Sequence, residues 1–249
     1  MKYGLSTLHA WIRFFESLIH LAYKIDIKKW QARSAEDKQI VQDSKKRIQE
    51  QFYLRLGLIV DKPKPGFGSS NDGNTARKFF ENASVVAEIC RIDENLIRRF
   101  HIILQTLSSG YEIDVEKFQN YAIETARTYT NLYNWYPLPT SVHRVLMHGA
   151  ETISSFDIPI GQLSEEAQEA RNKDIKNFRL NFARKTSRQD NLQDVFNRLL
   201  VSSDPVISSL RKTLPYKSNK PLLPEAVALL KEPNIHTNNF DSFEIDEDE

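Results

Sequence analysis

The chain has 249 residues, 40% hydrophobic and 27% charged, which allows one large or two small folded domains of ordinary globular composition. Its formal net charge of +1 gives no overall field that would attract nucleic acid, so any such argument must rest on a local cluster. The single cysteine, Cys90, excludes an internal disulfide and a cysteine-based zinc site, and no apolar run approaches the ~20 residues that span a bilayer.

The first predicted element is a helix, because apolar residues repeat at helical spacing from Leu8 to Ala22 and Ser6 can cap its start. Nearly all faces of this helix are apolar, which predicts that it is buried on several sides. The stretch carries charged residues and lacks a small-residue cleavage site, so it does not fit a signal peptide. Because the chain enters a core helix at once, we expect a further segment upstream.

A charged amphipathic helix is predicted from Ser34 to Leu56, with Ser34 and Asp37 placed like a capping box. Phe52 to Val60 could instead form a strand, although a helix fits its first part equally well. The next segment is dense in Pro and Gly, and loops of its length are usually functional or mobile. We expect four regions: N-terminal helices over 1–56, the Pro/Gly-rich loop over 57–74, a helical domain over 75–232 and a disordered acidic tail over 233–249.

Helical patterns fill the remainder up to the tail and predict a mainly α fold, a multi-helix domain without a catalytic sheet. The expected helices are Thr75 to Asn82, Val85 to Ile92, one that Asp93 caps and Gly110 stops, Val115 to Asn134, one from Thr140 or Ser141 to near Gly149 or just beyond, Ser164 to Ala183, Asp190 to Leu200, and one that starts at Asp204 and Pro205. No internal repeat is visible.

The segment from Ser164 to Arg188 begins with carboxylates and continues into a basic run. The carboxylates are Glu165, Glu166 and Glu169, and the basic residues, with only Asp174 against them, are Arg171, Lys173, Lys176, Arg179, Arg184, Lys185 and Arg188. Glu169 shares a helix face with Asn172, Lys173 and Lys176, an arrangement that would suit Mg²⁺ beside a phosphodiester. The basic run as a whole indicates contact with the phosphate backbone of DNA. The alternatives are carboxylates that complement the helix dipole and a solvated basic face.

His143 and His148 could supply two of the four ligands of a zinc site. Side chains five positions apart on a helix point in directions that differ by one full turn plus about 140°, so the two rings diverge. They could approach each other if the helix ended between them, as Gly149 suggests. Two helix histidines with unrelated roles are the alternative.

The loop before the helix at Thr75 offers hydroxyls, amides and backbone N–H groups, with Asn74, Arg77 and Lys78 beside it. This arrangement suits contact with a phosphate, and it equally suits an ordinary Asn-Gly turn that caps a helix.

Taken in order, four segments resemble the C-terminal part of the recombination-activating recombinase catalytic subunit and of the Transib-type DDE transposases. The segments are Leu8-His9, Gly73 to Arg77, His143 to His148, and Ser164 to Lys173. The matched order extends from about Leu8 to about Leu200. The family has an RNase H-like nuclease core with a large helical insertion, and it cuts and joins DNA with a carboxylate triad and Mg²⁺.

The resemblance implies that Glu169 corresponds to the last carboxylate of the triad and a ligand of Mg²⁺ or Mn²⁺, and that His143 and His148 correspond to two zinc ligands. It implies a mainly α chain that corresponds to the helical insertion and the final catalytic helix, without most of the sheet. The family's two catalytic aspartates and two zinc cysteines precede the Leu-His segment and are not in this chain, so neither metal site is complete. Asp61 and Asp72 are weak replacements, since both lie in the loop.

We therefore expect a partial DDE-type transposase that binds double-stranded DNA and does not cleave it alone. The alternative is a domesticated, non-catalytic module that binds DNA or protein, and a homodimer is a further option. Neither a membrane nor a small-molecule substrate is expected. The family implies the nucleus, and the cysteine content fits the nucleus or the cytosol. The acidic tail could compete with DNA for the basic run or serve solubility alone.

Overall fold

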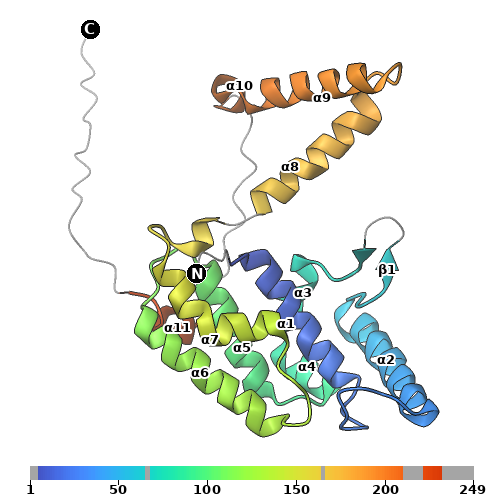
Figure 1. Cartoon of the computed structure of the whole chain (residues 1–249), viewed down its shortest axis with the longest axis vertical. Helices are drawn as coiled ribbons and strands as arrows, with labels where there is room; N and C mark the ends of the chain where they lie inside the picture. Colours follow the sequence, from blue (N-terminus) through green and yellow to red (C-terminus); the bar gives the residue numbers. More distant parts are fainter. Residues whose placement is uncertain (1–4, 65–67, 164–165, 210–220, 232–249) are drawn as a thin grey trace.

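The computed structural model describes residues 5–64, 68–163, 166–209 and 221–231, with side chains left out at 64, 68, 166–170 and 208. The fold is mainly helical, as the sequence predicts. Figure 1 shows a compact body of helices and, apart from it, a pair of helices that extends away. None of the helices in the described part of the chain is long and apolar enough to cross a bilayer.

Helix α1 (Thr7–Ala22) lies at the centre of the body and has buried residues on most of its faces, as its apolar pattern predicts. The predicted cap is confirmed, since Ser6 Oγ accepts a hydrogen bond from the backbone of His9 at 3.2 Å. Helices α3 (Gly73–Glu81), α5 (Glu94–Ser108) and α7 (Thr140–Ser154) pack against α1. Trp11 ties α1 to the end of α5, because its indole N–H donates to Ser108 Oγ at 2.9 Å.

The remaining helices of the body cover this centre. Helix α6 (Val115–Leu132) pairs with α7, α4 (Ala83–Cys90) contacts α2 (Ala35–Leu56), α3 and α5, and α11 (Pro224–Ala228) packs on α5. Large aromatic side chains fill the interior, where Phe14 meets Phe100 edge to face at 4.8 Å and Phe15 meets Phe79 at 4.9 Å. Such pairs add about 0.5–1.5 kcal/mol each to the apolar area that they bury.

The loop after α2 holds the two short strands of the described structure, β1 (Pro63–Lys64) and β2 (Gly68–Ser69), which pair antiparallel. The alternative of a strand over Phe52 to Val60 is wrong, because α2 continues to Leu56 and ends at Gly57 in the left-handed conformation (φ +62°). Helix α3 begins at Gly73, two residues before its predicted start, because Asp72 caps it and accepts from Thr75 N at 2.8 Å.

Helix α7 runs on to Ser154, five residues past Gly149, so Gly149 does not mark its end. Gly149 is buried against α6, where a Cβ would lie 3.1 Å from Phe118 Cε1. The glycine therefore permits close packing of two helices and does not terminate one.

The extended pair consists of α8 (Glu166–Asn177), the π-helical turn η2 (Phe178–Phe182), α9 (Arg188–Ser203) and the short α10 (Pro205–Ser209), which we call the α8–α10 hairpin. In Figure 1 its two long helices form a V above the body. The sequence predicts a helix from Ser164 to Ala183. In the structure its last turn is π-helical and ends at Phe182, one residue before the predicted end. The 3-10 turn η1 (Ile160–Leu163) precedes the hairpin and packs on α5.

Candidate nucleic-acid interface

The α8–α10 hairpin is held together by two of the basic residues that the sequence offers for DNA. The Arg171 guanidinium of α8 donates to the C-terminal end of α9, at 3.0 Å to the Leu199 carbonyl and at 2.7 Å and 2.6 Å to the hydroxyls of Ser202 and Ser203. These bonds satisfy carbonyl and hydroxyl groups where α9 ends, as basic residues near helix C-termini commonly do. Arg171 is therefore a structural residue of the hairpin.

Arg184, at the turn between the two helices, forms a second clamp with Asp194 of α9. Its backbone N–H and Nε both donate to Asp194 Oδ2 at 2.9 Å, and its NH2 donates to Oδ1 at 2.9 Å. The Arg184 hydrogen bonds lower the pKa of the Asp194 carboxyl to about 2. Such a bidentate ion pair fixes the relative orientation of the two side chains as well as pairing their charges. Arg171 and Arg184 thus both bind within the protein.

The start of α9 is fixed by a third set of polar contacts. Ser187 caps the helix and accepts from Asp190 N at 3.0 Å, while the Asp190 carboxylate accepts from the hydroxyls of Ser187 and Thr186 at 2.8 Å each. The hydroxyl donors, Ser187 first, lower the pKa of Asp190. Together these contacts define the turn that joins α8 to α9.

The other face of α8 is basic and points away from α9. Lys173 lies two residues, or about 200°, beyond Arg171, so it occupies the opposite side of the helix. Lys173, Lys176 and Arg179 follow one another at intervals of three, which makes them neighbours on the helix surface. All three are exposed, as are Lys185 and Arg188 at the turn. Within the described ranges, the side chains of Lys173, Arg179, Lys185 and Arg188 have no hydrogen bond or ion pair with the protein.

The predicted catalytic carboxylate cannot be placed as a side chain. The Glu169 backbone belongs to α8, one turn before Lys173, but its side chain and those of Glu166 and the other residues of that first turn lie outside the described residues, as does Glu165 entirely.

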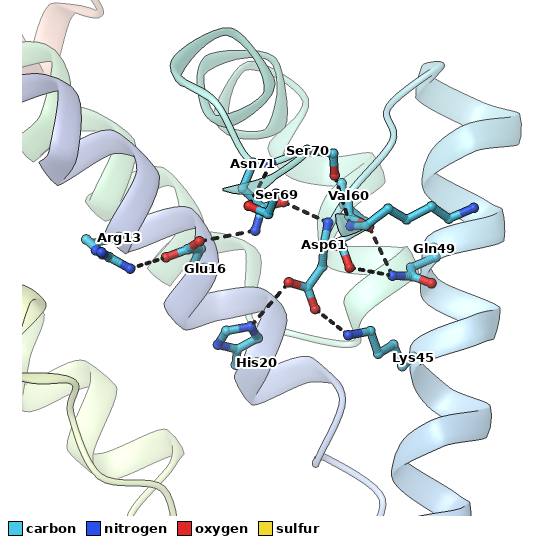
Figure 2. A network of polar contacts seen from close by, with 11 residues as sticks. Arg13, Glu16, His20, Lys45, Gln49, Val60, Asp61, Ser69, Ser70 and Asn71 are labelled. Atoms are coloured by element: carbon cyan, nitrogen blue, oxygen red, sulfur yellow. Dashed lines mark hydrogen bonds and ion pairs between the residues drawn. The ribbon is translucent and has the colours of Figure 1, made fainter. Parts of the chain in front are cut away.

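Asp61 and Asp72, the weak replacements for the absent aspartates, both have structural roles. Asp72 is the cap of α3, as described above. Figure 2 shows the Asp61 carboxylate between His20 of α1 and Lys45 of α2. Lys45 Nζ lies 2.6 Å from Oδ2 and His20 Nε2 lies 3.8 Å from Oδ1.

The same network fastens the loop to α1. The backbone N–H of Asp61 donates to Asn71 Oδ1 at 2.7 Å, and the Asn71 amide donates to Glu16 of α1 at 3.2 Å. Gln49 of α2 donates to the Val60 carbonyl at 3.0 Å. The network joins α1, α2 and both sides of the β1–β2 loop, and the loop's Pro/Gly composition gave no indication of it.

The two histidines meet on the surface of α7, although the helix does not end between them. Their ring centroids are 5.4 Å apart, less than the rise of about 7.5 Å between positions five apart, so the side chains lean toward each other. Two imidazoles on one tetrahedral zinc, at ~2.1 Å each, would place their centroids roughly 5–6 Å apart. No third His, Cys, Asp or Glu joins His143 and His148 to form a metal-binding group among the residues that the structure describes.

The predicted phosphate contacts of α3 are only partly exposed to a ligand. Asn74 and Lys78 are exposed, whereas Arg77 is half-buried and its guanidinium lies 5.6 Å from the centre of the Trp11 ring. Arg77 therefore packs against α1, in a cation–π contact, as well as lying near the helix start.

An apolar surface of the hairpin was not anticipated. Leu192, Phe196 and Leu200 repeat every four residues along α9 and are 53%, 55% and 55% exposed. A regular i, i+4, i+8 spacing of this kind is the signal that could have revealed it. No protein-family model matches the chain, and no curated protein is significantly similar to it in sequence.

Proposed function

We propose that the chain is a DNA-binding module of the DDE recombinase or transposase type, which contacts duplex DNA through the outer face of α8 and the α8–α9 turn. The observation that carries the proposal is that some basic residues of the hairpin bond to the protein while others are exposed. Arg171 and Arg184 hold the two helices of the hairpin together, while Lys173, Arg179, Lys185 and Arg188 are exposed and their side chains have no partner among the residues that the structure describes. Exposed lysines and arginines on a rigid helical support are suited to neutralising phosphates.

The first three segments of the resemblance lie close together in the fold. Its first two segments touch in space, because Leu8 of α1 lies against Gly73 of α3. Its third segment lies on α7, which also packs on α1. Three of the four segments thus belong to one packed unit.

The salt dependence of DNA binding tests the proposal. We expect the logarithm of the affinity for duplex DNA to fall with the logarithm of the salt concentration, with a slope of roughly 0.9 per phosphate contact. Replacement of Lys173, Arg179 and Lys185 together by Gln should reduce that slope by roughly 2.7. The matched control replaces Lys38, Lys46 and Arg127, which are exposed on the body, by Gln. An equal loss in both variants, or no binding by the intact chain, refutes the proposal.

We also propose that the chain does not cleave DNA by itself. The resemblance assigns one carboxylate, Glu169, to a reaction that the family performs with three, and one carboxylate cannot hold two metal ions in a defined geometry. Nicking of supercoiled DNA by the purified chain with Mg²⁺ or Mn²⁺, abolished in Glu169→Gln, would contradict this.

The apolar row on α9 favours a second candidate function, protein interaction. Leu192, Phe196 and Leu200 could pack against the same row of a second copy, since two-fold contacts bury identical patches. Sedimentation equilibrium should then show a dimer that Phe196→Asp dissociates, and a monomer at all concentrations would exclude this candidate.

A further inference from the structure

A groove runs along the α8–α10 hairpin beside the side chains that clamp it. Its volume is about 640 Å³, and its apolar walls come from Phe178 and Phe182 of η2, Val201 of α9 and Ile207 of α10. Phe182 and Val201 are 51% and 56% exposed. Arg198 lies over the Phe182 ring, with its guanidinium carbon 4.7 Å from the ring centre. The groove therefore offers aromatic and aliphatic contacts beside positive charge.

The hairpin around the groove is basic. Residues 166–209 contain eight lysines and arginines against two glutamates and four aspartates, a net charge of +2. Asp194 and Arg184 form an ion pair, so together they leave this net charge unchanged. A ligand that fits this surface combines apolar side chains with several carboxylates.

The last ten residues of the chain have this composition. Residues 240–249, with the sequence FDSFEIDEDE, contain Phe240, Phe243 and Ile245 between six carboxylates and no basic residue. The apolar side chains stand two or three positions apart, so the carboxylates flank each of them. Charge and apolar content are therefore complementary to those of the groove.

Described residues that precede the hairpin and the tail contact the same loop of the body. Before the hairpin, the Gln162 amide donates to the Gly110 carbonyl at 2.9 Å, and a Cβ on Gly161 would lie 2.5 Å from Gly110 N. Before the tail, Lys231 N donates to the Glu112 carbonyl at 2.9 Å. The hairpin and the tail are thus anchored to one loop, at positions two residues apart.

The length of α8 and the length of chain before residue 240 are comparable. Phe178 lies 12 residues beyond Glu166, roughly 18 Å along α8. From residue 231 to residue 240 an extended chain covers up to roughly 30 Å. A tether of this length keeps the local concentration of the tail in the millimolar range, so even a weak contact would be populated.

We propose that residues 240–249 bind in this groove, with Phe240, Phe243 and Ile245 against Phe178, Phe182 and Val201 and the carboxylates near Arg184 and Arg198, the basic side chains that line it. The proposal rests on the proposed function for its consequence: the bound tail adds six negative charges to the hairpin whose outer face DNA would contact, and so lowers the affinity for DNA. The contact itself does not depend on DNA.

A spin label on the tail of the full-length chain tests the contact directly. Cys90 is buried, and burial raises the pKa of its thiol, so a nitroxide reagent should attach selectively to Ser242→Cys. We expect the label to broaden the backbone amide signals of Phe182 and Val201 and to leave those of α2 sharp. Signals of the hairpin that are no broader than those of α2 would overturn the proposal.

The matched control changes Phe240, Phe243 and Ile245 to Ala in the labelled chain and keeps all six carboxylates. The broadening should disappear at moderate salt, because the apolar contacts place the tail in the groove. Persistence of the broadening in this variant would mean that the tail acts only as a diffuse counterion, and the groove would be excluded.

DNA binding gives the second readout. The triple Ala variant, measured without the label, should bind duplex DNA roughly tenfold more tightly than the unchanged chain, since a tethered competitor is lost. An unchanged affinity overturns the regulatory part of the proposal. If the intact chain binds no DNA at all, the proposed function fails, and the broadening experiment still decides whether the tail occupies the groove.

Discussion

Gly73 of α3 lies directly against Leu8 of α1, so that a Cβ built on Gly73 would come within 2.5 Å of Leu8 Cδ1. Leu8 is only 5% exposed, so its side chain has little room to move away. The close approach brings together two segments that are separated by 65 positions in the sequence. It also explains a glycine at the first position of a helix, where backbone freedom is not required.

We expect Gly73→Ala to lower the free energy of unfolding by about 1 kcal/mol, because the added methyl group overpacks a buried contact. Urea denaturation measures this loss. Asn74→Ala, at the next and exposed position, serves as the control and should have little effect. In a double-mutant cycle, Leu8→Val should recover part of the loss by making room. Additive effects of the two substitutions would show that the contact is not responsible.

Asp61 combines an ion pair with a left-handed backbone (φ +52°), and the two contributions can be separated by three substitutions. Asn tolerates the conformation and still accepts a hydrogen bond from Lys45, whereas Gly tolerates it and accepts none. Ala does neither, so Asp61→Ala should be less stable than Asp61→Asn by about 1–2 kcal/mol, with Asp61→Gly between them. Urea denaturation should give this order, and Glu50→Ala on the exposed face of α2 is the control. If Asp61→Gly is less stable than Asp61→Ala, the left-handed backbone at residue 61 does not contribute to the effect.

The sequence predicts most helices of the body because apolar spacing and capping residues act locally. Asp93, for example, is confirmed as the cap of α5 and accepts from Leu96 N at 2.8 Å. Gly149 shows where local interpretation fails. A glycine late in a helix is a common stop signal, and only the neighbouring α6 explains why it lies inside α7.

The candidate interface was predictable only in part, because the sequence does not show which residues of different helices meet. The basic run of α8 is visible in the sequence, but its division into structural and exposed residues depends on α9. Arg171 and Arg184 are indistinguishable from their neighbours until Ser203 and Asp194 are placed beside them. The contacts of Asp61 likewise involve side chains of α1 and α2. The composition of the loop does not predict that these helices lie beside it.

The Arg184–Asp194 clamp should respond to acid. The pKa of Asp194 is lowered from 3.8 to about 2, so its stabilisation is fully present above pH 4 and is lost as the pH falls through about 2. The Arg184 Nε–H signal should therefore remain in its bonded position at pH 3 and shift near pH 2. In Arg184→Gln the midpoint of the Asp194 carboxyl, followed by NMR, should return toward 3.8. A midpoint near 3.8 in the unchanged chain would show that the clamp does not form in solution.

The paired histidines of α7 predict weak zinc binding that requires both rings. Their centroid separation of 5.4 Å fits joint coordination, and within the described residues no further His, Cys, Asp or Glu completes the site. Calorimetric titration should give one zinc per chain, with affinity that falls as the pH is lowered because protons compete for the imidazole nitrogens. His143→Gln and His148→Gln should each abolish the signal, whereas His20→Gln should leave it unchanged. Binding that survives either α7 substitution would place the zinc elsewhere and leave the two histidines as a surface ring contact.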